Sequence, residues 1–96
     1  MEAEYKLDIQ GDMTIYEAGE IRDLFSSTLA EHENINVNLS SVSEIDSSGL
    51  QLMVSLKCDA EQQEKNISFS SHSQAVIDLL DLFDMTSYFG DPIVIN

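Results

Sequence analysis

The sequence predicts a single α/β domain over residues 1–96, with a mostly parallel sheet of about four to five strands, an antiparallel hairpin at one edge and about three to four helices. Segments in which apolar and polar residues alternate, typical of strands, take turns along the chain with segments of helical periodicity. Strands joined by helices pair in parallel through right-handed crossovers. With 43% hydrophobic and 23% charged residues, the 96-residue chain suffices for one modest core.

The N-terminal third is expected to form the edge hairpin and the first helix. Residues 5–9 alternate as a half-buried strand does, and Met13 is the candidate start of a short second strand. Thr14 and Glu17 have the spacing of a capping box, which predicts a helix from there to residues 30–31. Apolar residues at helical spacing form its expected buried face: Ile15, Ala18, Ile21, Phe25 and Leu29.

The rest of the chain continues the alternation of strands and helices. Residues 35–39 predict a strand, residues 50–60 the most buried helix, and residues 67–70 a further short strand. A second capping box at residues 71–74 precedes a helix, and the apolar residues 93–95 predict a final strand. The buried face of that helix is expected to comprise Val76, Leu79, Leu80 and Phe83.

Charge narrows the classes of partner. The net charge of −14 would repel phosphate backbones and anionic lipid surfaces, so we expect neither nucleic-acid binding nor membrane insertion. A basic protein surface is the natural complement, and simple solubility is an equally good reason for so many carboxylates. The N-terminus has no apolar signal segment, and no apolar run in the sequence is long enough to span a bilayer. We therefore expect a cytoplasmic protein.

Residues for catalysis or metal binding are sparse. Glycine-rich nucleotide motifs and the HExxH zinc motif are missing, and the lone Cys58, expected to be a small core residue, excludes an intrachain disulfide. His32 and His72 lie in polar connections, where a solvated histidine is the better interpretation than a general base. Asp81 and Asp84 share a helix face but lack further oxygen ligands for a metal. We therefore expect no cofactor, no metal and no enzyme activity.

The segment EIDSSGL, residues 44–50, places two hydroxyls and a carboxylate between two apolar segments. From the residues alone, Ser47 or Ser48 is the N-cap of the helix that follows, because a serine hydroxyl accepts a hydrogen bond from a free amide of the first turn. Asp46 would favour the positive end of the helix dipole, and Gly49 allows close approach to the backbone. A cap requires only one of these residues, so the others call for a separate explanation.

A longer window around this segment resembles the STAS domain of bacterial anti-sigma factor antagonists, and the resemblance extends over nearly the whole chain. It is carried by residues 39–50 together with Leu52, Met53 and Leu56. The resemblance implies that the helices pack on one side of the sheet. One departure is the pair Lys65 and Asn66, where many members of the family carry a glycine.

The resemblance also implies a switch. In that family a partner kinase, often itself the anti-sigma factor, phosphorylates the serine after the aspartate, and the phosphate abolishes complex formation. By this correspondence Ser47 is the expected phosphoacceptor, and Asp46, Ser48, Gly49 and Leu50 complete the partner-binding loop. The expected partner is an anti-sigma factor or a serine kinase-like protein, and the free chain is expected to be a monomer.

Other roles remain open from the sequence. Similar domains serve chemotaxis or biofilm signalling, stressosome-like assemblies and a bacterial phospholipid transporter. In the last type the loop around Ser47 would dock a partner without being phosphorylated. A small hydrolase with Ser47 as nucleophile is the second class of hypothesis, although the sequence places no base beside it.

Overall fold

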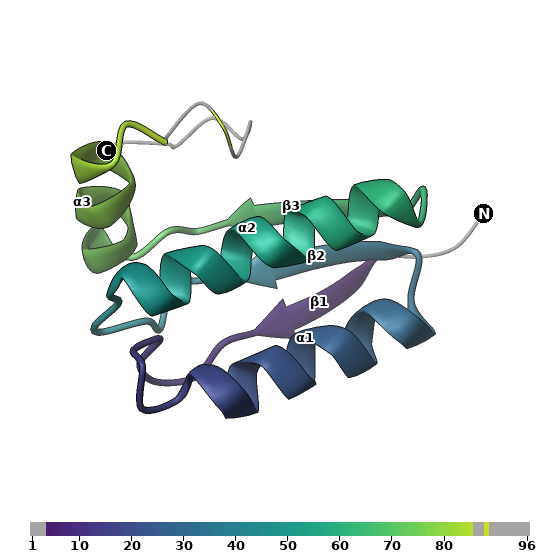
Figure 1. Cartoon of the computed structure of the whole chain (residues 1–96), viewed down its shortest axis with the longest axis horizontal. Coiled ribbons are helices and arrows are strands. Elements are labelled where there is room, and N and C mark those ends of the chain that lie inside the picture. Colours follow the sequence, from purple (N-terminus) through teal and green to yellow (C-terminus); the bar gives the residue numbers. More distant parts are fainter. Residues whose placement is uncertain (1–3, 86–87, 89–96) are drawn as a thin grey trace.

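The computed structural model describes residues 4–85 and Tyr88 (Figure 1). Strands and helices alternate along this part of the chain, and the three strands form one parallel sheet in the order β1-β2-β3. The elements are β1 (Tyr5–Asp8), α1 (Ala18–Glu31), β2 (Asn34–Asn38), α2 (Ser47–Gln62), β3 (Asn66–Ser70) and α3 (Gln74–Leu82). The predicted parallel α/β domain is thus confirmed, with three strands among the described residues; the strand expected at residues 93–95 lies outside them.

The predicted antiparallel hairpin is wrong for these residues. Met13 forms an isolated parallel bridge with Ile45 instead of pairing with β1. Its amide donates to the Glu44 carbonyl at 2.8 Å, and its carbonyl accepts from the Asp46 amide at 3.3 Å. Met13 is fully buried, because the chain after β1 crosses beneath the start of α2 rather than turning back along its own strand.

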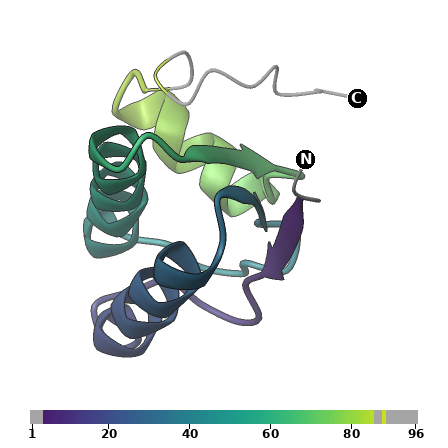
Figure 2. The same ribbon diagram turned by 90° about the vertical axis from the view of Figure 1, so that its right-hand side faces the viewer.

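The two long helices lie on the same face of the sheet, as Figure 2 shows from the side. Between them and the strands lies a continuous core that includes Phe25, Val37, Met53 and Phe69. α3 lies near the carboxyl ends of the strands, where the Ser73 amide donates to the Leu39 carbonyl at 3.3 Å (Figure 1). α1 and α2 thus pack on one side of the sheet, as expected, whereas α3 lies at the end of the sheet where the strands finish.

The opposite face of the sheet is polar. Asn36 donates to the Ser68 hydroxyl at 2.9 Å and accepts from the Ser70 hydroxyl at 2.7 Å. In the next row Asn66 donates to Asn34 at 2.8 Å. Side chains that lie opposite or diagonal to one another on β2 and β3 therefore satisfy one another, which suits a face that neither α1 nor α2 covers.

Four local expectations are corrected. Phe83, expected on the buried face of the last helix, follows the end of α3 and is exposed. The helix after Thr14 begins only at Ala18, so Ile15 is 65% exposed instead of buried. α3 is capped by Ser73, whose hydroxyl accepts from the Val76 amide at 3.3 Å, rather than by the first serine of its predicted capping box. Cys58 is exposed, because the core side of α2 passes through Leu56 and Ala60.

Candidate functional site

The segment 44–50 comprises the end of the connection from β2 to α2 and the first residues of α2, at the carboxyl ends of the parallel strands. Ile45 is held by its bridge to Met13, and Asp46 follows in extended geometry as the N-cap of α2. Ligands and partners of open parallel sheets commonly approach this edge. The position of the segment is therefore one at which a small polar cluster is accessible yet rigidly supported.

Asp46 is the cap, and the predicted capping role of Ser47 or Ser48 is wrong. One carboxylate oxygen of Asp46 accepts from the amides of Ser48 at 2.9 Å and Gly49 at 3.3 Å. The other accepts from the Ile15 amide at 3.0 Å, across 31 positions of sequence. The Ile15 amide is the main cause of the lowered pKa of Asp46, followed by the amides of Gly49 and Ser48, because amide donors stabilise the carboxylate over the acid.

Ser47 is the first residue of α2, and its side chain is exposed. Its hydroxyl makes no hydrogen bond with any residue in the described part of the chain, since the carboxylate of Asp46 already occupies the capping position. Ser48, by contrast, is half-buried. The structure thus separates two roles that the sequence left merged: Asp46 caps the helix, and Ser47 presents a free hydroxyl at its N-terminus.

Gly49 and Leu50 face inward. A Cβ atom at Gly49 would lie 2.2 Å from the Met13 carbonyl oxygen and 2.8 Å from Cγ1 of Ile45, so only glycine fits. Leu50 is 6% exposed and belongs to the core. Both residues fix the position of the segment, and their direct contact with a partner stays a prediction.

Two residues beside the segment were missed by the sequence interpretation. Ile15 and Tyr16 lie in the turn before α1, and their side chains are 65% and 91% exposed. The hydrogen bond from the Ile15 amide to Asp46 ties this turn to the start of α2. The sequence did indicate that at least one of these side chains is exposed, because two adjacent large apolar residues cannot both lie along the narrow buried stripe of one helix.

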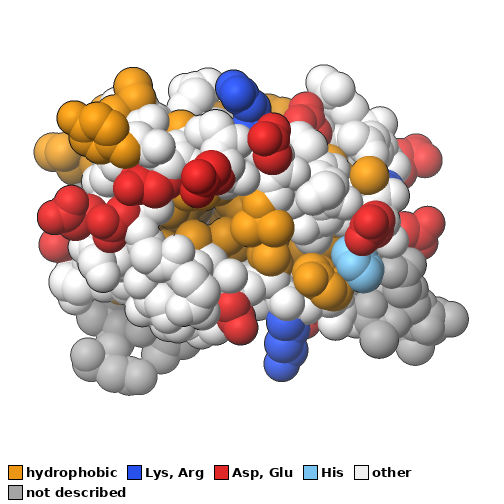
Figure 3. All heavy atoms as spheres, turned by 90° about the horizontal axis from the view of Figure 1, so that it is seen from below, with side chains coloured by type: hydrophobic (Ala, Val, Ile, Leu, Met, Phe, Trp, Pro, Cys, Tyr) orange, Lys and Arg blue, Asp and Glu red, His pale blue; other side chains and the backbone are white. Residues whose placement is uncertain are grey.

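Carboxylates surround the segment. Asp12 accepts from the Glu44 amide at 3.1 Å, and Glu17 accepts from the Thr14 amide at 3.3 Å. Figure 3 shows acidic side chains spread over one face of the molecule, several of them bordering hydrophobic ones in a hollow. Among residues 4–85 and 88, no cluster of three or more potential ligand side chains could hold a metal ion. None of the helices described is long and apolar enough to cross a bilayer.

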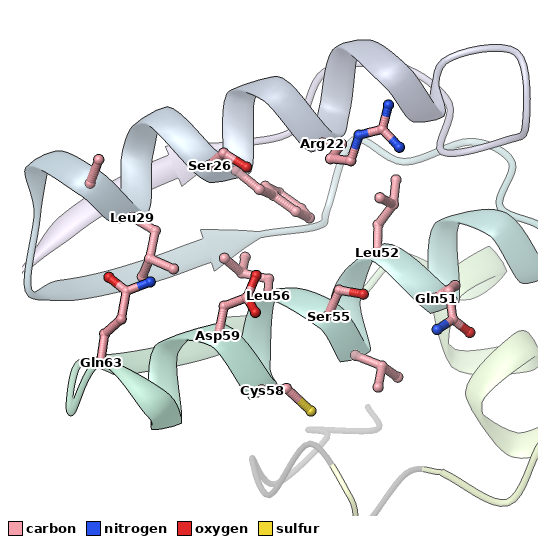
Figure 4. Close-up of a pocket in the computed structure, with 13 residues that line it drawn as sticks. Arg22, Ser26, Leu29, Gln51, Leu52, Ser55, Leu56, Cys58, Asp59 and Gln63 are labelled. Carbon is pink, nitrogen blue, oxygen red and sulfur yellow. The ribbon is translucent and has the colours of Figure 1, made fainter.

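A separate groove of about 520 Å³ runs between α1 and α2 (Figure 4). Phe25, Leu52 and Leu56 contribute apolar surface to it, and Arg22 and Asp59 are among its polar lining residues. Ser47 does not line this groove, and neither does Asp46. The groove is therefore distinct from the segment that opens α2.

Comparison with known proteins assigns the fold. A family model described as "Mlab, STAS domain" matches residues 2–94. No curated protein matches the chain with significant similarity. The match covers nearly the whole chain, and the STAS fold is compatible with the parallel sheet and the helices of this structure. This chain belongs to the STAS-domain family.

Proposed function

We propose that this chain is a phosphorylation-switched protein-interaction module, similar to an anti-sigma factor antagonist, with Ser47 as its phosphoacceptor. The observation that carries the proposal is the exposed Ser47 hydroxyl, which is free of hydrogen bonds to described residues while Asp46 caps the helix. A kinase can therefore reach the hydroxyl without dismantling the cap. The unphosphorylated form binds an anti-sigma factor or serine kinase-like protein, and phosphorylation releases it.

The chemistry of the phosphate explains the release. Phosphorylation adds about −1.5 to −2 charge and three strong acceptor oxygens. The Ser48 and Gly49 amides are already bonded to Asp46, but the helix dipole favours negative charge at the N-terminus of α2, so the fold need not change. The binding surface does change, since a dianion beside Asp46 resists burial against an apolar or acidic partner patch. A loss of about 3 kcal/mol weakens binding more than about a hundredfold.

We propose a binding module rather than a hydrolase. His32 stacks on Tyr5 with ring centroids 3.9 Å apart, at the amino ends of the strands, whereas Ser47 lies beyond their carboxyl ends. A serine nucleophile needs a base within hydrogen-bond reach, and no described residue hydrogen-bonds the Ser47 hydroxyl. Lack of labelling by an electrophilic phosphonate is the expected result, and labelling at Ser47 would contradict it.

A second candidate is a constitutive binding subunit, of the kind that serves lipid transport, in which the Ser47 segment docks without being phosphorylated. The words of the family description, "Mlab, STAS domain", do not mention sigma factors, which keeps this candidate open. A signalling component of a chemotaxis or biofilm pathway would use the same switch with a different partner. Mass spectrometry of the protein from its native cells separates the classes, because only a switch carries phosphate on Ser47.

The switch is tested by pull-downs with the wild-type chain, Ser47→Ala and Ser47→Asp. We expect Ser47→Ala to retain the partner and Ser47→Asp to lose it while thermal melts show all three folded. Ser55→Asp is the matched control, because Ser55 is an exposed serine two turns further along α2 and gains the same charge. Equal recovery of one partner by all four chains would refute the switch.

A further inference from the structure

We propose that Ile15 and Tyr16 form an apolar anchor that docks into a partner protein's apolar pocket bordered by lysine and arginine side chains. This inference deepens the proposed function, since the anchor lies beside Ser47, but it rests on separate observations. They are the exposure of the two side chains, the rigidity of their turn and the charge around it.

The two side chains of the anchor are large and apolar or aromatic, yet most of their surface is exposed to solvent. Tyr16 is 91% and Ile15 65% exposed, and both belong to the same turn before α1. Tyrosine is over-represented among residues that dominate binding energy, because it buries a large area with few rotatable bonds. Nothing in the fold requires this residue to be large, since Tyr16 contributes almost no buried surface to the core.

The turn that carries the anchor is held in place on both sides. The Glu17 carboxylate accepts from the Thr14 amide at 3.3 Å, and the Glu17 amide donates to the Thr14 carbonyl at 3.0 Å. The Tyr16 amide donates to the Thr14 hydroxyl at 3.3 Å, and the Ile15 amide is bound by Asp46. A turn ordered before binding loses little conformational entropy when it docks, so more of its contact energy appears as affinity.

Asp46 joins the anchor to the phosphoacceptor. Its carboxylate bonds the Ile15 amide on one side and the first amides of α2 on the other, and Ser47 is the next residue. The anchor and the Ser47 hydroxyl therefore belong to one surface. A partner that buries Tyr16 covers or borders Ser47, so a phosphate on Ser47 opposes that contact where it faces the apolar pocket of the partner rather than the lysine and arginine side chains at its border.

The charge around the anchor defines the rim of the complementary pocket. The carboxylates of Asp12 and Glu17 accept hydrogen bonds beside and within the turn, and the chain as a whole carries −14. A partner with acidic residues around its pocket would be repelled, whereas lysine and arginine would pair with this border and speed encounter. Binding should therefore weaken as salt concentration rises.

The test places a photo-crosslinking amino acid, p-benzoylphenylalanine, at position 16 of the full chain in its native cells, with the same substitution at Leu82 as control. Leu82 is 77% exposed on α3 and outside the anchor. We expect one dominant protein adduct from position 16, with the crosslink mapped to apolar residues flanked by lysine or arginine. The identified protein, purified, should bind Tyr16→Ala at least about tenfold more weakly than wild type, and Leu82→Ala unchanged.

The outcomes separate the anchor from the switch. An adduct at position 16 that Ser47→Asp abolishes supports both, and an adduct that Ser47→Asp leaves intact supports the anchor but refutes the switch. Ser47-dependent recovery of a partner without an adduct at position 16 overturns the anchor alone. Scattered adducts on many proteins, or unchanged affinity of Tyr16→Ala for the crosslinked protein, also overturn it.

Discussion

Replacing Gly49 with alanine tests how closely α2 approaches the rest of the fold. The new Cβ would lie 2.2 Å from the Met13 carbonyl oxygen and 2.9 Å from the Met13 Cβ. A Cβ atom essentially never lies closer than 3.0 Å to an atom that it is not bonded to, so α2 and Met13 must separate by about 0.8 Å. The nearest atom is a backbone oxygen, which cannot move aside as a flexible side chain does.

The size of the effect follows from what that separation disturbs. Overpacking of this kind costs about 1–3 kcal/mol. The two backbone hydrogen bonds that hold Met13 to Glu44 and Asp46 contribute about 0.5–1.5 kcal/mol each, and the separation weakens both. In the opposite direction, alanine in place of glycine stabilises a helix by about 0.5–1 kcal/mol, because glycine loses more backbone entropy on folding. We therefore expect Gly49→Ala to lower the free energy of unfolding by about 2–3 kcal/mol.

Gly19→Ala is the matched control, because Gly19 also lies in the first turn of a helix but a Cβ there meets nothing within 4 Å. It should raise the free energy of unfolding by about 0.5–1 kcal/mol. Urea denaturation of both variants measures the difference, and the midpoint of Gly49→Ala should fall by about 1–2 M. A Gly49→Ala variant as stable as Gly19→Ala would show that α2 does not rest on Met13 as described.

Two further predictions concern the residues that open α2. Ser47→Ala should change the free energy of unfolding by less than about 0.5 kcal/mol, because the Ser47 hydroxyl does not cap the helix; a loss of about 1 kcal/mol in urea denaturation would restore the capping interpretation. Asp46→Asn should be less stable than wild type at neutral pH, since ionised Asp46 has a lowered pKa in the fold. The stability that ionised Asp46 contributes is fully present above its ordinary pKa of 3.8 and is lost as the pH falls through its lowered pKa in the fold. The free energies of unfolding of wild type and Asp46→Asn, measured against pH, should therefore converge in acid. A difference between them that does not change with pH would contradict this.

The secondary structure was largely predictable because its signals are local. The helical spacing of Ile21, Phe25 and Leu29 correctly placed the buried face of α1, and alternation placed β2 to within one residue. Boundaries were less accurate where a competing contact intervened. The turn at Thr14 satisfies its own hydrogen bonds and is drawn to Asp46, so α1 begins later than its capping box indicated.

The candidate site divides between what the sequence determined and what only the tertiary structure decided. The sequence by itself determined that residues 44–50 open a helix after a buried strand, and its resemblance singled out Ser47, because both depend on residues adjacent in the chain. Only the tertiary structure decided that Asp46 is the cap, that Gly49 must be glycine and that the turn carrying Ile15 is bonded to Asp46, the residue before Ser47. Each of these depends on Met13 and Ile15 approaching α2 across about thirty positions of sequence, and hydrogen bonds over that separation leave no local periodicity to read.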